Sequence, residues 1–412
     1  MSEQVLAYRE AERVVLAEAR KLLECERMAQ RVSLSSSAGR ILAEAVHADR
    51  DQPPFPRATR DGFAWSAGSS VAGPHRVLGT VRAGEMWNGA PLASGEAVEI
   101  MTGAAVPEGA DAVAMVEHVE RSGDEVRLQE GRVIKAGENI VPVGAEARSC
   151  DVVAPAGTRL GPAQIAAAAA CGYAEIAVAA KARVAILATG DELVPVAETP
   201  APAQIRNSNS YSLSAQLLAM GAEPVRLPIV PDDARATEEA IRAALACDLL
   251  VMTGGVSMGR FDYVEQALGR VGAEFLFTGV KMQPGRPVVF GRARHEGEPR
   301  YFLGLPGNPV STMVTFALFG APLVAALMGE TPERWPRWTR GALTREVSVK
   351  PGLTRFLPAQ IESSIDGVRV TPVMWQGSGD LASTARAEGF VVVPEEAERL
   401  EAGAKVTALL LG

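Results

Sequence analysis

The spacing of hydrophobic residues changes several times along the chain, and each change predicts a different kind of structure. Residues 4–25 place Val and Leu at near-helical intervals, which predicts a long amphipathic helix. From 50 to 148, short β-branched runs alternate with Gly and Pro, as in a small β-rich domain. Residues 149–180 return to a Pro/Gly hinge and an Ala-rich helix. We therefore expect a first, helical and linker domain of residues 1–49 plus 149–180, with residues 50–148 inserted into it.

Strands and helices alternate from residue 181 to residue 330. The pattern predicts strands near 184–190, 224–230, 248–255, 275–280, 287–292 and 300–304, and helices at 209–220, 234–246, 262–270 and from Asn308. This alternation is typical of a doubly wound α/β domain. Residues 331–412 have short strands, turns and no long helix, which predicts a terminal β-barrel or sandwich, and we expect the barrel. The expected fold class is thus a multidomain α/β and β protein.

Charge and rare residues narrow the chemistry. Lys and Arg number 41 against 49 Asp and Glu, a formal charge of −8, which argues against a nucleic-acid partner. The four cysteines form no CxxC pair and the four histidines no i,i+3 or i,i+4 pair, so a metal would need carboxylate ligands. The charged N-terminus is no secretory signal, and we expect a cytoplasmic protein. The uncharged stretch 305–329 fits a buried helix better than a membrane span.

Polar residues follow several strands of the expected α/β sheet, where such sheets bind ligands. Asp191 and Glu192 follow the first strand, and Asn207 and Asn209 precede a helix. The alternative for these side chains is a purely local role, as helix caps or solvated charges.

The glycine-rich loop MTGGVSMGRFDYV, residues 252–264, is the most specific of these signals. Gly254 and Gly255 allow backbone amides to approach an anion, and Ser257 adds a hydroxyl group. Asp262 adds a carboxylate where a helix begins. We expect this loop to bind a phosphate-like group.

Two further loops supply rigid backbone and positive charge. LGLPGNPVS, residues 303–311, contains Pro306, Asn308 and Pro309, which either shape a pocket or only fix the start of a helix. VKMQPGRP, residues 280–287, contains Lys281 and Arg286, cations suited to phosphate or another oxyanion. The alternative for this pair is a solvated turn.

Carboxylates suggest a metal site at the same edge. Asp232 and Asp233 follow another strand and could hold Mg²⁺ through oxygen ligands, together with Glu192 or Asp262. Capping of the following helix is an equally good explanation for the Asp pair.

Motifs of this kind occur in order along nearly the whole chain. They are ATRDGFA (58–64), EIMTGAAVPEGADAVAMVE (99–117), GENIVPVGAEA (137–147), LATGDELV (187–194), RNSNS (206–210), TGGVSMGRFDYV (253–264), PGRP (284–287) and LPGNPVS (305–311). With these motifs the chain resembles the molybdopterin molybdenumtransferase (MoeA) family, whose fold is shared by the gephyrin E domain.

The resemblance implies the last step of molybdenum cofactor assembly. Molybdate and adenylyl-molybdopterin would be the substrates, AMP would be released, and Mg²⁺ would assist. The central α/β domain would be similar to molybdopterin adenylyltransferase. By motif position the acidic site residues are Asp61, Glu192, Asp232 and Asp262, of which the last three would hold the metal.

The resemblance also assigns substrate-binding residues. They are Thr102, Asn207, Asn209, Gly254, Gly255, Ser257, Lys281, Arg286, Pro306, Asn308, Pro309, Arg355 and Ser378. The chain departs from the family at Gly279 and Gln283, where many relatives carry Lys, so Lys281 and Arg286 are the expected replacements. Asp380 also places an acid beside an expected anion site.

The family is expected to form homodimers with sites shared between subunits. Protein partners would be the molybdopterin adenylyltransferase and later proteins of molybdoenzyme maturation. Two alternatives stay open on sequence alone: a gephyrin-like scaffold that binds peptides, and the adenylyltransferase itself. The acidic residues argue against a pure scaffold, and the additional domains argue against the adenylyltransferase.

Overall fold

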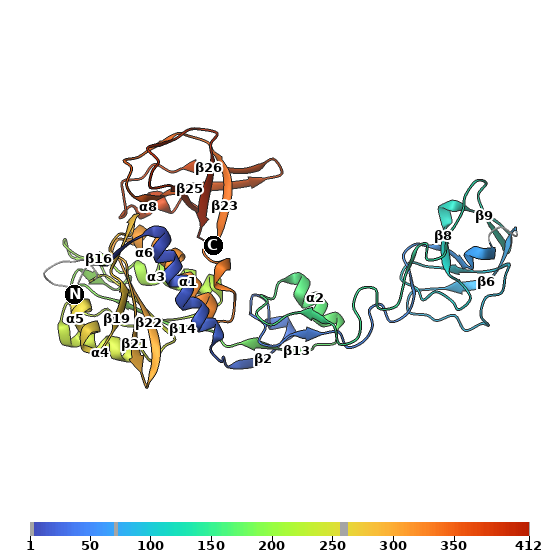
Figure 1. Ribbon diagram of the computed structural model, residues 1–412, viewed down its shortest axis with the longest axis horizontal. Helices are drawn as coiled ribbons and strands as arrows, with labels where there is room; N and C mark the ends of the chain where they lie inside the picture. Colours follow the sequence, from blue (N-terminus) through green and yellow to red (C-terminus); the bar gives the residue numbers. More distant parts are fainter. Residues whose placement is uncertain (1–3, 70–72, 256–262, 412) are drawn as a thin grey trace.

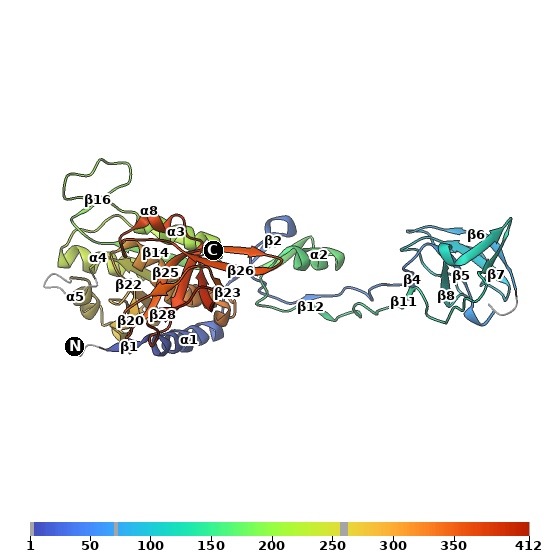
Figure 2. The ribbon, with the colours of Figure 1, turned by 90° about the horizontal axis from the view of Figure 1, so that it is seen from above.

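The computed structural model describes residues 4–69, 73–255 and 263–411. Figures 1 and 2 show an elongated molecule. The α/β domain and the C-terminal domain lie side by side at one end, a small domain lies in the middle, and the β-rich domain lies at the far end.

The α/β domain is built on a mixed sheet with strand order β17-β14-β18-β22-β21-β19. β17, β14, β18 and β22 are parallel, β21 pairs antiparallel with β22, and β19 pairs antiparallel with β21. The strands are β14 (Arg183–Ala188), β17 (Glu223–Arg226), β18 (Leu249–Thr253), β19 (Glu274–Phe277), β21 (Val289–His295) and β22 (Glu298–Leu305). A parallel pair, β15 (Leu193–Val194) and β16 (Ile205–Arg206), lies outside the sheet.

Helices cover both faces of this sheet. One apolar core joins it to α1 (Tyr8–Glu24), α3 (Asn209–Met220), α6 (Pro309–Thr315), a π-helical turn (Phe316–Gly320) and α7 (Ala321–Leu327). A second core joins the other face to α4 (Ala234–Ala244) and α5 (Tyr263–Arg270). The helical stretch Pro309–Leu327 is long and apolar enough to cross a membrane, but 89% of its most apolar window is buried inside the protein. This is the buried helix that the sequence favours.

The small middle domain pairs β2 (Ala29–Ser33) with β13 (Glu175–Ala179), and β3 (Val46–His47) with β12 (Val152–Ala154), beside α2 (Pro162–Ala170). The β-rich domain has a sheet of order β8-β5-β7-β6-β10-β9. Its strands are β5 (Gly62–Trp65), β6 (His75–Val81), β7 (Glu96–Ile100), β8 (Ala112–Met115), β9 (Val119–Ser122) and β10 (Glu125–Leu128). The antiparallel pair β4 (Arg57–Ala58) and β11 (Ile140–Val141) lies where the chain enters and leaves this domain.

The C-terminal domain is a closed barrel. β25 (Thr354–Ser364) pairs with both β26 (Gly367–Pro372) and β27 (Gly389–Val393), while β23 (Trp338–Leu343) and β29 (Lys405–Leu410) complete the ring. The pair β24 (Val347–Ser348) and β28 (Arg399–Leu400) and the short helix α8 (Leu381–Thr384) flank it.

Two expectations about single elements are wrong. The expected strand 275–280 is two strands, because β19 belongs to the α/β sheet whereas β20 (Gly279–Gln283) joins the barrel through β25. The expected helix 4–25 begins only at Tyr8, because β1 (Val5–Ala7) pairs in parallel with β20.

Candidate functional site

Asp61 and Thr102 of the β-rich domain are joined directly. Asp61 precedes β5 and Thr102 follows β7, and Gly62 pairs with Ile100 across these antiparallel strands. The Asp61 carboxylate accepts hydrogen bonds from the Thr102 hydroxyl at 2.7 Å and the Thr102 amide at 2.6 Å. These bonds stabilise the ionised form and lower the pKa of Asp61, so it is a carboxylate at neutral pH. The pair is exposed and available to another molecule.

Gly62 explains why this carboxylate is followed by glycine. A Cβ atom at position 62 would overlap the carbonyl oxygen of Ala114 in the neighbouring strand β8. Only glycine allows β5 and β8 to approach so closely at this point. The Asp-Gly sequence thus places Asp61 at the tip of a closely packed strand.

The glycine turn after β18 lies against the end of β14. Gly254 and Gly255 have φ angles of 88° and 61°, which favour glycine. A Cβ atom on Gly254 would lie 2.5 Å from the Thr189 carbonyl oxygen, and one on Gly255 would lie 2.9 Å from the Thr189 hydroxyl oxygen. Ser257 and Asp262 of the same loop lie outside the described residues.

Asn209 joins three loops at the carboxyl edge of the sheet. Its Nδ2 donates to the Thr253 hydroxyl oxygen at 2.8 Å and to the Gly307 carbonyl oxygen at 2.7 Å. Thr253 ends β18, Gly307 lies in the loop after β22, and Asn209 begins α3. One amide group therefore fixes the loop after β22 relative to the glycine turn.

Asn207 has a local role instead. Its side chain is buried, donates to the Ser210 hydroxyl oxygen at 2.9 Å and accepts from the Ser210 amide at 3.1 Å. This geometry stabilises the start of α3. Asn207 therefore supports the loop before α3.

Pro306, Asn308 and Pro309 form the loop that begins α6. The Thr312 hydroxyl donates to the Pro306 carbonyl oxygen at 2.6 Å, which ties the loop to the helix. Pro309 occupies the first helical position and Asn308 the N-cap position, but the Asn308 side chain makes no capping bond and is exposed. The exposed Asn308 side chain can therefore contact a ligand.

The C-terminal domain reaches this loop through Ser378. The amide of Val310 in α6 donates to the Ser378 carbonyl oxygen at 3.0 Å. Asp380 caps α8 and accepts from the amides of Ser383 at 3.0 Å and Gln376 at 2.9 Å. These backbone bonds lower the pKa of Asp380. Its charge is thus used to fold the loop that carries Ser378, which accounts for an acid at an expected anion site.

The acidic loops after β14 and β17 also meet. The Asp191 carboxylate accepts from the Asp232 amide at 3.1 Å, and the Gly190 amide donates to the Val230 carbonyl oxygen at 3.2 Å. Glu192 and Asp232 are both exposed on these adjoining loops. They are therefore two carboxylates available at one corner of the α/β edge.

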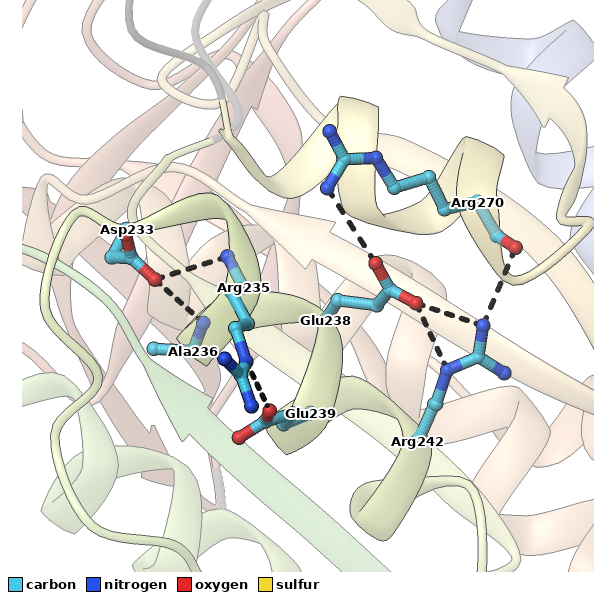
Figure 3. Close-up of polar contacts among 7 residues, drawn as sticks. All are labelled: Asp233, Arg235, Ala236, Glu238, Glu239, Arg242 and Arg270. Carbon is cyan, nitrogen blue, oxygen red and sulfur yellow. Dashed lines mark hydrogen bonds and ion pairs between the residues drawn. The ribbon is translucent and has the colours of Figure 1, made fainter.

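Asp233 is the capping residue of the Asp pair. Figure 3 shows its carboxylate accepting from the amides of Arg235 at 3.0 Å and Ala236 at 2.8 Å, at the start of α4. The other charges drawn there are paired along α4 and α5, where Glu238 accepts from Arg242 and contacts Arg270. The capping alternative thus holds for Asp233, whereas Asp232 donates its backbone amide to the Asp191 carboxylate.

The described residues contain no group of three His, Cys, Asp or Glu side chains placed to hold a metal ion. Glu192 and Asp232 offer the oxygen ligands that Mg²⁺ prefers. Asp262, the third expected ligand, lies outside the described ranges. The donor set that is present fits Mg²⁺, which commonly binds through one or two carboxylates and substrate phosphates.

The cations lie on β20 and the turn after it. Lys281 and Gln283 are both exposed on β20 and, two residues apart, share one face. Gln283 pairs with Arg355 of β25, whose guanidinium donates to the Lys350 carbonyl oxygen at 2.7 Å. Arg286 is exposed. An arginine from the barrel is therefore next to the position where a lysine is missing.

The structure separates the two halves of the predicted site within one chain. The strand-end loops lie in the α/β domain, while Asp61 and Thr102 lie in the β-rich domain at the opposite end of the molecule (Figures 1 and 2). A single chain in this conformation does not bring them together.

Two threonines at this edge of the sheet were not predicted as site residues from the sequence. Thr189 and Thr253 are 3% and 2% exposed and lie beneath the glycine turn. Thr253 binds Asn209, and Thr189 is the residue that both glycines must approach. A threonine at the carboxyl end of a buried strand and directly before a glycine is the signal that could have identified them.

Known families match the chain in three consecutive parts. Residues 6–172 match the MoeA N-terminal region (domain I and II), residues 185–326 a probable molybdopterin binding domain, and residues 340–411 the MoeA C-terminal region (domain IV).

Relatives and solved structures agree with these matches. The chain is 34% identical to the molybdopterin molybdenumtransferase of Bacillus subtilis (strain 168), over 92% of this chain and 89% of that one. It is 32% identical to the protein of the same name from Haemophilus influenzae, over 91% of this chain and 92% of that one. The crystal structure of the molybdopterin biosynthesis moeA protein from Pyrococcus horikoshii OT3 has a TM-score of 0.80 at 28% identity, covering 99% of this chain and 100% of that one.

These comparisons confirm both the resemblance and the multidomain fold class inferred from the sequence. The relatives are more than 30% identical across about nine-tenths of the chain. The chain therefore belongs to the molybdopterin molybdenumtransferase family, the transferases of molybdenum cofactor biosynthesis.

Proposed function

We propose that this transferase acts on adenylyl-molybdopterin and molybdate, places the metal in the dithiolene and releases AMP. The observation that supports this most is the convergence of loops on Asn209, which binds both Thr253 and Gly307. Glycine amides, the exposed Asn308 and the Ser378 loop meet at this edge, so it offers many donors to a phosphate and a pterin.

Lys281 and Arg286 supply positive charge to the anionic substrates, in place of lysines at Gly279 and Gln283. Lys281 and Arg286 are both exposed, whereas a Cβ atom at Gly279 would lie 3.1 Å from Val5 Cγ2, a tight contact that requires Val5 to shift. Arg355 adds a further cation on the strand next to Gln283. Together they offset the charge of phosphate or molybdate.

Mg²⁺ would be held by Glu192, Asp232 and Asp262, with the remaining ligands from water and substrate. The ion would neutralise charge on the phosphate oxygens. The adjoining loops of Glu192 and Asp232, fixed by the Asp191 bond, support this assignment. The carboxylates of Asp191 and Asp233 accept hydrogen bonds from backbone amides and so hold these loops in place.

The active unit is a homodimer with a site shared between subunits. Asp61 and Thr102 form an exposed pair far from the loops of their own chain, so a partner chain is the natural source of the facing loops. The enzyme acts in the cytoplasm, receives its substrate from the molybdopterin adenylyltransferase and passes the product to proteins that mature molybdoenzymes.

Release of AMP tests this function. Purified protein is incubated with adenylyl-molybdopterin and Mg²⁺, with and without molybdate. We expect AMP only when molybdate is present. Equal AMP release in both samples, or none in either, would contradict the proposal.

The neighbouring aspartates supply a matched pair of variants. Asp232→Asn removes a proposed metal ligand and should lower the rate by about 10² or more. Asp233→Asn removes the same charge one residue away, and Asn is also a good N-cap, so the rate should stay near wild type. If both variants are equally active, Asp232 does not bind the metal.

A further inference from the structure

Glu330 is a buried carboxylate at the meeting point of three domains. It follows α7 and is only 3% exposed. Its carboxylate accepts from Arg159 Nη2 at 2.6 Å and Nε at 3.2 Å, and from Trp335 Nε1 at 3.1 Å. Burial raises the pKa of Glu330, but these hydrogen bonds outweigh it, so the pKa lies below its ordinary value. The carboxylate is therefore charged and fully engaged.

Arg159 comes from the middle domain and makes further contacts. Its Nη1 donates to the carbonyl oxygens of Gly39 at 2.7 Å and Met220 at 3.1 Å. Gly39 lies in the middle domain, whereas Met220 ends α3 and Glu330 follows α7 of the α/β domain. One guanidinium thus joins the two domains through fixed directions, which its planar donors favour.

The surroundings are close-packed. Arg27, in the link from α1 to β2, donates from Nε to the Ala326 carbonyl oxygen at 3.1 Å, near the C-terminal end of α7 where a cation is favourable. A Cβ atom on Gly157 would lie 3.1 Å from the Gly329 carbonyl oxygen. The chain segments of the two domains therefore approach closely around the Arg159–Glu330 pair.

Trp335 connects the same carboxylate to the barrel. It begins the segment that leads into β23, and the Arg337 guanidinium lies 4.5 Å from its ring centre. Trp335 and Arg337 line a small cavity together with Met220 and Leu411. Glu330 therefore contacts the middle domain on one side and the start of the C-terminal domain on the other.

We propose that Arg159 and Glu330 are positioning residues that set the direction of the arm formed by the middle and β-rich domains. An apolar pair could give similar stability, because desolvation offsets much of the attraction in a buried ion pair, whereas a two-pronged ion pair fixes an orientation. The β-rich domain lies at the far end of this arm (Figure 2), so a small rotation at the joint moves Asp61 and Thr102 a long way. This inference rests on the proposed shared site.

The first test measures the direction of the arm. In a Cys150→Ser background, spin labels are placed on the exposed Cys25 and on Ser122→Cys in the β9–β10 hairpin, in labelled chains diluted with unlabelled ones. Arg159→Met should broaden the distance distribution, and Arg159→Lys, which keeps the charge, should broaden it less. Arg334→Ala is the matched control, because Arg334 lies 3.9 Å from Glu330 but is largely exposed. If Arg159→Met does not fold, Arg159→Lys must still give a broader distance distribution than this control.

The second test measures catalysis in the same variants. A displaced arm should lower kcat by roughly tenfold or more for Arg159→Met, and change the affinity for adenylyl-molybdopterin far less. Arg159→Lys should recover part of the rate, and Arg334→Ala should match wild type. A distribution as narrow as the control, or a broad distribution with unchanged kcat, would overturn the positioning role. An inactive wild-type protein would instead indicate that the proposed function is wrong.

Discussion

Asn209 gives the sharpest structural prediction, because one side chain joins β18 to the loop after β22. Asn209→Ala removes the bonds to Thr253 and Gly307, each contributing about 1 kcal/mol. Gly307 is exposed and its carbonyl oxygen can turn to water, whereas the Thr253 hydroxyl is buried. Of the two bonds, the one to Gly307 holds the loop, so we expect the loop to be destabilised by about 1 kcal/mol, or about fivefold in the opening equilibrium.

Hydrogen exchange followed by mass spectrometry measures this opening directly. Peptides that cover residues 303–315 should exchange about fivefold faster in Asn209→Ala. Asn207→Ala is the matched control, because the Asn207 side chain bonds to Ser210 at the start of α3. It should accelerate exchange at that helix start and leave residues 303–309 unchanged. Affinity for adenylyl-molybdopterin should fall more in Asn209→Ala than in Asn207→Ala. Wild-type exchange in residues 303–309 of Asn209→Ala would refute the linking role.

Three further predictions follow from other regions. Gly62→Ala would place a methyl group on the Ala114 carbonyl oxygen, so thermal unfolding should show the β-rich domain destabilised by about 3 kcal/mol, and an unchanged transition would contradict this. Burial raises the pKa of Glu18, but its hydrogen bonds outweigh burial and hold the pKa below its ordinary value. The ionised carboxylate therefore stabilises the fold above about pH 4.5, and this stabilisation is lost as the pH falls. The free energy of unfolding measured in urea should therefore fall less on acidification for Glu18→Gln than for wild type. Equal falls in the two proteins would contradict this prediction. Neutralising Arg286 or Lys281 should weaken substrate binding in a titration with little effect on unfolding, and unchanged affinity in both variants would mean that these cations are wrongly assigned.

Local sequence was sufficient for most of the α/β domain. The expected helix 209–220 is α3 (Asn209–Met220), because its apolar positions face the sheet and Gly221, with φ at 89°, ends it. The strands β14 and β18 are continuous apolar runs, as expected where both faces of a parallel sheet are covered. The spacing of the apolar residues and the residues that end each element carry this information within about ten residues.

Pairing between distant segments could not be read in the same way. Val5–Ala7 has the composition of the helix that follows it, and becomes a strand only because β20, more than 270 residues later, offers a free edge. The same partner choice divides the expected strand 275–280 between two sheets. Such choices depend on tertiary contacts, which local propensity does not contain.

The candidate site shows the same division. Glycine spacing and strand-end polar residues indicated the Gly254–Gly255 turn and Asn209, whereas Asp61 and Thr102 came only from the resemblance. The roles of Asp233 and Asp380 as helix caps became clear only from their bonds to backbone amides. A carboxylate before a helix predicts a cap as well as it predicts a ligand, and the sequence does not separate the two.

A subunit-mixing measurement tests the shared site most directly. Asp61→Asn damages the β-rich side and Glu192→Gln damages the α/β side, and each homodimer should be inactive. In a shared site, a mixed dimer places both lesions in one site and leaves the other intact. Random exchange then gives half mixed dimers with half their sites working, or about a quarter of wild-type AMP release. Both homodimers must be folded and the mixed dimer confirmed by mass spectrometry. Recovery near one quarter is the predicted result, and no recovery under these conditions would contradict a site built from two subunits.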